Sequence, residues 1–220
     1  MPSRGLNRLL WTAILLLLGV LGFKARNNLE TIFDRVGKLE IDSVTPAGTI
    51  SMRWRGKIEA PMKSRIAEAF AQHRGEARTF VLALSSSGGS LTHGAQVVAL
   101  LREIGETHHL ETVVEAGGWC ASMCVPVYLQ GQRRLADAAA RFMFHEVSYN
   151  EFWTNEKLAV PESATLSETD KLFRDYFAPA GVSEHWIRKV RTEMTGGRDI
   201  WKTGQELADA HAGIVQEIRN

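Results

Sequence analysis

Short apolar runs alternate with amphipathic segments along most of this 220-residue chain, and this alternation restricts the folds that it can adopt. The run TFVLAL (79–84) is continuously apolar, which is typical of a strand buried on both faces. ETVVEA (111–116) and RFMF (141–144) are further strands. Apolar residues recur at helical spacing in 59–73 and again in 92–104. This order predicts an α/β domain with a mainly parallel sheet and right-handed crossovers.

The remaining segments complete the domain. Residues 49–58 alternate apolar and basic side chains, as a half-exposed strand does. A short helix is expected over about 123–129. Residues 150–168 are polar and are expected to form an irregular loop, whereas 167–194 are expected to be helical. The segment 203–218 is predicted to close the chain with a helix and a short strand.

The N-terminus differs from the rest of the chain. Arg4 and Arg8 precede an uncharged apolar run over residues 9–23. That run is shorter than the roughly 20 residues of a straight membrane-spanning helix, although Lys24 and Arg26 can snorkel and extend its reach. Three interpretations stay open: an uncleaved signal anchor, a cleaved signal peptide and a buried helix of the domain.

Both export interpretations place the domain outside the cytoplasmic membrane, because the basic flank stays in the cytoplasm. We expect a signal anchor or signal peptide over 1–26, a linker and first strand over 27–48, and the domain over 49–220. The expected location is the inner membrane, with a single span over 9–23 and the domain on the periplasmic side. The alternative is secretion to the periplasm. A net charge of +1 gives no indication of a nucleic-acid partner.

The two cysteines of the chain, Cys120 and Cys124, flank Ser122 in GGWCASMC. In an exported protein an even number of cysteines indicates a disulfide. Without a further Cys or His pair nearby they are an incomplete zinc site, so no metal is expected. Their C-x-x-x-C spacing also differs from that of thioredoxin-type redox pairs. The alternative to a disulfide is a pair of free thiols packed as small apolar side chains.

Polar residues follow three of the apolar strands, at strand ends where α/β folds place their sites. In SSSGGS (85–90), Gly88 and Gly89 allow a sharp turn that exposes backbone N–H groups, although a simple strand-to-helix turn has the same pattern. Ser122 lies between a strand and a helix, where serine is commonly a helix N-cap. His145 follows RFMF, and a single histidine at a strand end is often structural.

Taken together, the three features are more specific. A nucleophilic serine needs a base within hydrogen-bond reach, a group that orients the base, and donors aimed at the developing oxyanion. Ser122 can attack, and His145 can transfer the proton. The backbone amides of Gly88, Gly89 and Met123 can supply the donors. The sequence therefore predicts a serine-type catalytic site.

The motif order S-x-G-G-S, then A-S-M, then an apolar strand ending in His resembles the proteolytic subunit of Clp-type proteases, within the ClpP/crotonase superfamily. The similarity covers residues 50–218. It implies a ClpP/crotonase-like fold of repeated β-α units. It also implies that Ser122 is the nucleophile, that His145 is the base, and that Gly88 and the Met123 amide form the oxyanion hole.

The family also has an aspartate in an R-D-x-aromatic segment before its closing helix. GRDIWKTGQELADAHAGIV resembles that segment, which implies that Asp199 orients His145. If Asp199 does not, Glu146 and Asp175 are the alternatives, or the site is a Ser–His dyad.

The chain departs from the family pattern at several positions. Ser87 replaces the usual proline of the glycine turn. Cys120 and Cys124 replace small residues, and the resulting C-A-S-x-C motif resembles a branch of exported ClpP-like proteins. A disulfide between them would hold the backbone of the nucleophile in one orientation. The segment after His145 lacks the glycine-rich handle of the family, so a large ring is not implied, although a homo-oligomer is expected.

The resemblance implies a membrane-anchored or periplasmic serine peptidase that cuts peptides or unfolded protein segments through an acyl-enzyme, without a cofactor. An esterase with the same triad is a second interpretation. A CoA enzyme of the superfamily is not expected, because CoA is not found outside the cytoplasm. The non-enzymatic alternative is a pseudoenzyme that binds exposed peptide strands or a membrane partner.

Overall fold

The computed structural model describes residues 37–149 and 158–219. The larger sheet has six strands in the order β1-β2-β3-β4-β6-β9. β1 runs antiparallel to β2, and the other neighbouring pairs are parallel. The strands are β1 (Lys38–Ile41), β2 (Thr49–Arg55), β3 (Thr79–Ser85), β4 (His109–Val114), β6 (Arg133–Asp137) and β9 (Glu217–Arg219). The predicted α/β class with a mainly parallel sheet is therefore confirmed.

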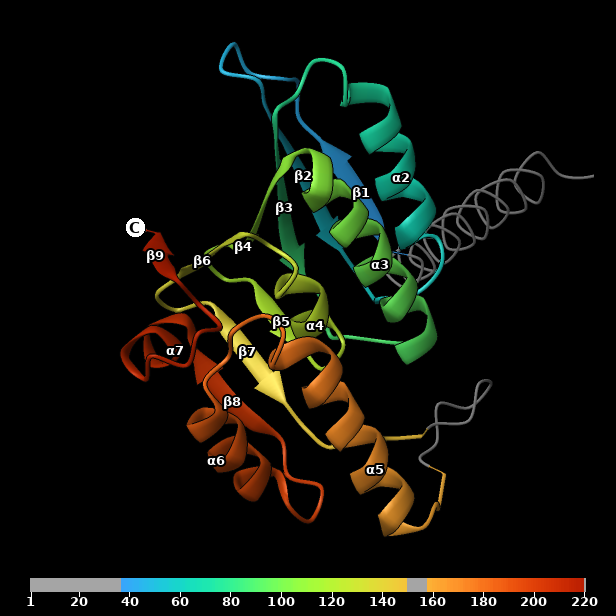
Figure 1. The fold of residues 1–220 in the computed structure, drawn as a ribbon, viewed down its shortest axis with the longest axis vertical. Helices are drawn as coiled ribbons and strands as arrows, with labels where there is room; N and C mark the ends of the chain where they lie inside the picture. Colours follow the sequence, from blue (N-terminus) through green and yellow to red (C-terminus); the bar gives the residue numbers. More distant parts are fainter. Residues whose placement is uncertain (1–36, 150–157, 220) are drawn as a thin grey trace, which may run out of the picture.

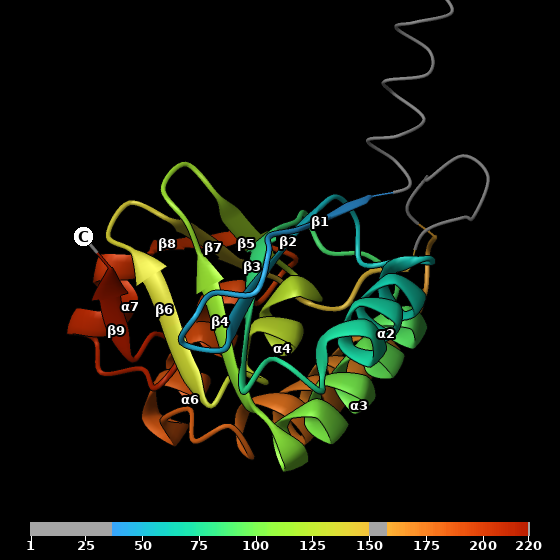
Figure 2. The ribbon, with the colours of Figure 1, turned by 90° about the horizontal axis from the view of Figure 1, so that it is seen from above.

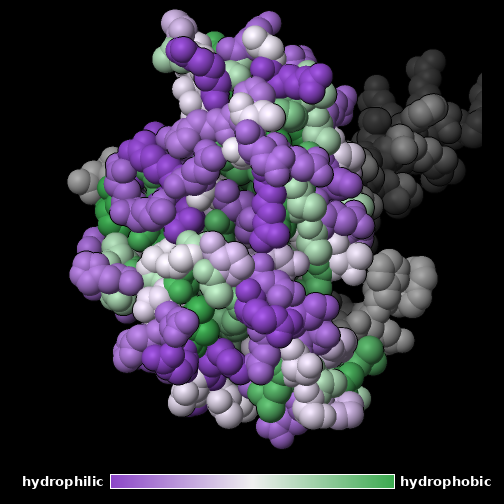
Figure 3. All heavy atoms as spheres, viewed as in Figure 1, coloured by the Kyte–Doolittle hydropathy of each residue, from purple (hydrophilic) through white to green (hydrophobic). Residues whose placement is uncertain are grey.

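Two long helices, α2 (Met62–His73) and α3 (Leu91–Thr107), lie side by side against one face of this sheet (Figures 1 and 2). Alternate residues of β2, namely Ile50, Met52 and Trp54, are fully buried in the core that the helices share with the sheet. The opposite face carries a smaller buried cluster of Ala83, Val113 and Leu135. On the molecular face seen in Figure 3, hydrophilic residues cover most of the area and hydrophobic residues lie in smaller areas among them.

A second sheet of three strands lies beside the first. β5 (Trp119–Ala121) is parallel to β7 (Arg141–Phe144), and β7 is antiparallel to β8 (Ile200–Thr203). The helices of the C-terminal half lie near this sheet (Figure 1). They are α5 (Glu162–Leu172), which continues into the π-helical turn η1 (Phe173–Phe177), then α6 (Glu184–Met194) and α7 (Gly204–Asp209). The short helix α4 (Cys124–Tyr128) follows β5 closely.

Two predictions about the C-terminal half were wrong. Residues 162–168 belong to α5 rather than to an irregular loop, while 150–157 lie outside the described residues. The helix expected over 167–194 is interrupted between η1 and α6, because Pro179 has no backbone N–H and Gly181 has a φ of +75°. Strands β5, β6 and β8 were not expected from the sequence.

The N-terminal expectations are only partly covered by the structure. The strand expected within 27–48 is β1. The apolar segment 9–23 lies outside the described residues. Among the helices in 37–149 and 158–219, none has the length and apolar character that a membrane span requires.

Candidate active site

Ser122 lies between β5 and α4 in a strained backbone conformation. Its φ is +54°, which is uncommon for a residue with a side chain. Its N–H donates to the carbonyl of Met143 on β7, at 2.9 Å, and its own carbonyl accepts from Val125, also at 2.9 Å. The N-cap position of α4 belongs to Met123, so Ser122 does not cap this helix. The fold instead holds Ser122, which is half-buried, at a sharp elbow.

His145 meets Ser122 because β5 and β7 are parallel neighbours. Ala121 pairs with Met143 in the ladder, so the residues that follow both strands emerge at the same edge. The His145 Nε2 atom lies 2.7 Å from Ser122 Oγ. This distance allows an unprotonated Nε2 to accept the hydroxyl proton. The structure thus brings together the predicted nucleophile and the predicted base.

Gly88 lies directly against the elbow. Its φ is +89°, and a methyl group on it would come within 2.7 Å of Ser122 Cβ and 3.1 Å of the Met123 nitrogen. Glycine therefore allows the turn to approach the nucleophile and the Met123 amide. The Gly88 N–H itself donates to the hydroxyl of Ser86, at 3.1 Å. Of the predicted oxyanion donors, the Gly88 amide thus already has an acceptor within its own turn.

Gly89 serves a different contact from Gly88. A methyl group on Gly89 would come within 2.6 Å of the carbonyl oxygen of Ile58. The turn also pairs with Ile58 through the carbonyl of Gly88 and the N–H of Ser90. Ser90 then caps α3 by accepting from the N–H of His93 at 3.3 Å. Gly89 therefore allows the turn to pack closely against Ile58, as expected of a simple strand-to-helix turn.

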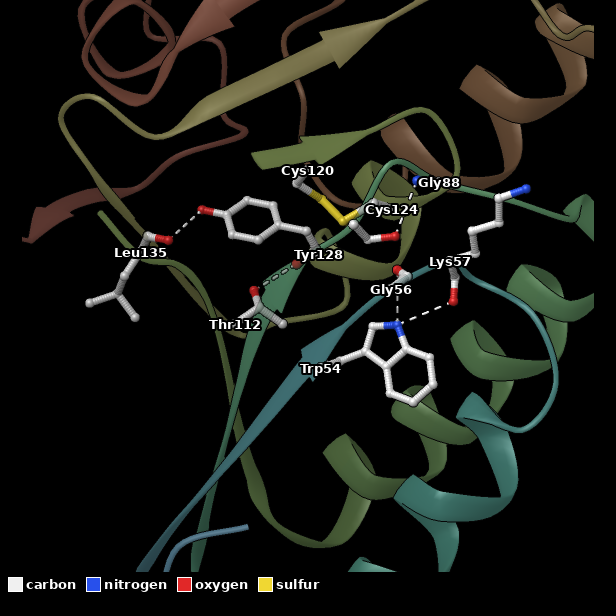
Figure 4. Close-up of a disulfide and its surroundings, with 10 residues drawn as sticks. Trp54, Gly56, Lys57, Gly88, Thr112, Cys120, Cys124, Tyr128 and Leu135 are labelled. Atoms are coloured by element: carbon white, nitrogen blue, oxygen red, sulfur yellow. Dashed lines mark hydrogen bonds between the residues drawn. A yellow bond between two sulfur atoms is a disulfide. The ribbon is translucent and has the colours of Figure 1, made fainter. Parts of the chain in front are cut away.

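The two cysteines form a disulfide that spans the elbow. Cys120 on β5 and Cys124 on α4 are bonded, with 5.2 Å between their Cα atoms, and both are fully buried (Figure 4). This confirms the expected pairing. Tyr128 anchors the other end of α4, because its hydroxyl donates to the carbonyl of Leu135 at 3.0 Å and its own carbonyl accepts from Thr112 at 2.7 Å. Burial raises the pKa of Tyr128 far above its ordinary value, so the hydroxyl stays a donor.

Asp199 lies across from His145 in the continuation of the β7–β8 ladder. Phe144 pairs with Ile200 at the end of that antiparallel ladder, so the next position on β7 faces the position before β8. Asp199 is exposed, and its carboxylate makes no hydrogen bond or ion pair within the described part of the chain. Its role as the group that orients His145 stays a prediction.

The two alternative carboxylates have other partners. Glu146 Oε2 accepts from the N–H of Gly197 at 3.1 Å. Asp175 Oδ1 accepts from Arg174 at 3.1 Å.

Two further residues support the elbow without a recognisable local signal. Ser86 holds the Gly88 amide, and Gly94 of α3 leaves room for the buried Met123 side chain, which a methyl group would overlap. Such contacts join distant segments, so sequence patterns do not reveal them.

Two surface hollows lie away from the serine. One of about 610 Å³ is lined by Arg74, Arg78, His108 and neighbouring residues at the amino ends of β3 and β4. Another of about 350 Å³ is lined by Glu146 together with residues of α5 and α6. Ser122 and His145 line neither of them. Within 37–149 and 158–219, no group of three or more His, Cys, Asp or Glu side chains could hold a metal ion.

The comparisons with known proteins support the fold. No protein-family model matches the sequence, and no curated protein matches it either. Among solved structures, the chain is similar to a point mutant of ClpP1 from Listeria monocytogenes, with a TM-score of 0.57 and 20% sequence identity. The match covers 79% of this chain and 92% of that one. The fold is therefore ClpP-like, and at this identity the similarity concerns the fold alone.

Proposed function

We propose that this chain is a serine-type hydrolase, and most specifically a ClpP-like peptidase that uses Ser122, His145 and Asp199. The observation that carries the proposal is the 2.7 Å contact between His145 Nε2 and the Ser122 hydroxyl, on a serine whose φ is +54°. A strained elbow that presents a hydroxyl to an imidazole is the arrangement that nucleophilic catalysis requires. The ClpP-like fold supports the same reading.

In the first half-reaction, Ser122 Oγ attacks the carbonyl carbon of the scissile bond while His145 Nε2 takes the hydroxyl proton. The Met123 N–H, next to Gly88, donates to the developing oxyanion. The Gly88 N–H becomes a second donor when it exchanges Ser86 for the oxyanion. His145 then gives its proton to the leaving amine, and the acyl group stays on Ser122.

In the second half-reaction, His145 takes a proton from water, and the resulting hydroxide attacks the acyl carbon. The proton returns to Ser122 Oγ as the bond to the acyl group breaks, which frees the carboxylic acid product. Asp199 holds the His145 ring in the required orientation. No cofactor enters this scheme. The substrates are peptides or unfolded protein segments.

The proposed location is the inner membrane, with residues 9–23 as the span and the domain on the periplasmic side; secretion to the periplasm is the alternative. The basic flank of the apolar run supports this orientation. The Cys120–Cys124 disulfide is what an oxidising compartment allows. Assembly as a homo-oligomer is part of the same proposal.

A pseudoenzyme that binds peptides is the second candidate, and two observations favour it. The carboxylate of Asp199 is exposed, and the Gly88 amide already donates to Ser86. An esterase with the same residues is a third reading, because acyl transfer to Ser122 is the same step for esters and amides.

Hydrolysis assays separate these candidates. The purified protein is given an unstructured fluorogenic peptide and, separately, an activated ester, with Ser122→Ala as the control. Peptide turnover that disappears in Ser122→Ala supports the peptidase. Ester turnover without peptide turnover supports the esterase. Binding of the peptide by both proteins without turnover of either substrate supports the pseudoenzyme and contradicts the main proposal.

A further inference from the structure

Glu146 follows His145 and contacts the turn that leads to Asp199. Its Oε2 atom accepts the N–H of Gly197 at 3.1 Å. Gly197 lies two residues before Asp199, and Glu146 is the next residue after His145. This hydrogen bond therefore joins the segment with the proposed base to the segment with the proposed orienting carboxylate.

The turn at 195–198 contains two glycines, so contacts with other segments are important for holding its backbone in one conformation. Gly196 and Gly197 have φ values of +82° and +75°, and a methyl group at Gly196 would meet nothing within 4 Å. Glycines in open space retain much backbone freedom in the absence of other contacts. Arg198 closes the turn onto α6, since its N–H donates to Met194 at 3.0 Å. The Glu146 bond links this turn to the segment that follows β7.

The charges around Glu146 leave its carboxylate available for this bond. It lines the hollow of about 350 Å³ together with Arg188 and Arg191. Each arginine has another carboxylate partner: Arg188 pairs with Glu184 at 3.5 Å, and Arg191 pairs with Asp170. Among the described residues, the hydrogen-bond donor to the Glu146 side chain is the Gly197 N–H.

We propose that Glu146 is a positioning residue: its bond to Gly197 holds the glycine turn so that Asp199 lies against His145. The inference rests on the proposed catalytic function. It assigns Glu146 no contact with substrate. The paired register of β7 and β8 ends at Phe144 and Ile200, so a further contact is needed to hold an exposed Asp199 beside the base.

The test measures the rate constant for reaction of the full-length protein with a fluorophosphonate. Glu146→Ala removes the acceptor and is expected to lower the rate on the order of 10-fold to 100-fold, as small misplacements of catalytic groups do. Glu146→Gln keeps an acceptor oxygen and is expected to restore most of the rate. Glu184→Ala is the matched control, because it removes an 88% exposed carboxylate that pairs with Arg188 of the same hollow, and it should react like the wild type.

A double-mutant cycle separates positioning from general structural support. In an Asp199→Ala background, Glu146→Ala should cause no further loss, because the residue that it positions is gone. An additive loss, or a wild-type rate for Glu146→Ala, would overturn the inference while leaving Ser122 as the nucleophile. If the wild type does not react at all, the catalytic proposal fails instead. Amide hydrogen exchange of residues 195–199 then still decides whether the bond holds the turn. Exchange is expected to be faster than in the wild type in Glu146→Ala and unchanged in Glu146→Gln.

Discussion

A methyl group at position 88 tests how closely the glycine turn and the nucleophile are fitted together. Gly88→Ala places Cβ within 2.7 Å of Ser122 Cβ at a φ of +89°, so the turn must move away from the elbow. We expect hydrolysis to fall on the order of 10²-fold, the cost of losing an oxyanion donor. Gly75→Ala is the matched control, since its methyl group meets nothing within 4 Å. Unchanged hydrolysis by Gly88→Ala would remove this turn from the site.

The disulfide is expected to act on the geometry of the elbow more than on global stability. The loop between Cys120 and Cys124 is very short, so closing it removes little entropy from the unfolded chain. The double variant Cys120→Ala/Cys124→Ala should therefore lose a larger fraction of its rate of hydrolysis than of its free energy of unfolding. Parallel measurements of denaturant unfolding and hydrolysis check this. A variant with full activity would show that the bond is not needed for the site.

The side chains of the proposed catalytic site were predictable from the sequence, whereas the contacts that hold them were not. His145 follows a recognisable apolar strand, and Ser122 lies in a motif that resembles a known family, so both residues could be nominated from the sequence, although β5 directly before Ser122 was not expected. The acceptor role of Ser86 and the link from Glu146 to Gly197 depend on segments that meet only in the folded chain. The sequence also offers Glu146 as a partner of the base, and in the structure its Oε2 atom accepts the N–H of Gly197 in the turn before Asp199.

At the scale of elements, Arg134 fixes β6 to the C-terminal half. Its guanidinium is buried and donates to four backbone carbonyls, those of Gly131, Ala180, Gly213 and Ile214. Burial lowers the pKa of Arg134, and the carbonyl oxygens compensate for the lost hydration. Removing the side chain would take this donor away from all four carbonyls.

We expect Arg134→Met to lower the free energy of unfolding by about 3 kcal/mol, because it leaves buried carbonyls unsatisfied. Arg133→Met, the same change one residue earlier, is the control. Arg133 forms ion pairs with Glu111 and Glu217, but its side chain is 45% exposed, so its loss should cost less than about 1 kcal/mol. Urea unfolding measures both variants. Equal losses would contradict a special role for the buried cation.

The same residue explains why β6 was missed. RRLAD has the composition of a polar segment, so it does not resemble a buried strand. Arg134 can be buried there because backbone carbonyls from distant segments accept its hydrogen bonds, and sequence patterns do not show such partners. Polar composition also hid the start of α5, ESATLSETDKL, which buries few of its side chains. Apolar strands such as TFVLAL were predictable because burial on both faces leaves a direct signature in composition.

For the whole molecule, the alternation of strands and helices was sufficient to predict the α/β class. It could not predict the second sheet, because β7 pairs with β8 across a long stretch of chain that contains α5, η1 and α6. In the proposed site that pairing is important, because the register of β7 and β8 puts position 199 opposite position 145.

Export of the domain is testable with reporters fused to the C-terminus. A reporter that is active only outside the cytoplasm should be active, because the basic residues Arg4 and Arg8 are expected to keep the N-terminus inside. A reporter that works only in the cytoplasm should be silent. The reverse pattern would show that the domain stays in the cytoplasm, where a disulfide at the elbow would not be expected to persist.

The central claim is that Ser122 is a nucleophile activated by His145. Reaction of the purified protein with a fluorophosphonate, followed by mass spectrometric mapping of the adduct, tests it most directly. The account predicts one adduct, on Ser122, and its loss in both Ser122→Ala and His145→Ala. Equal labelling of Ser122→Ala, or no labelling of the wild-type protein, would contradict the claim.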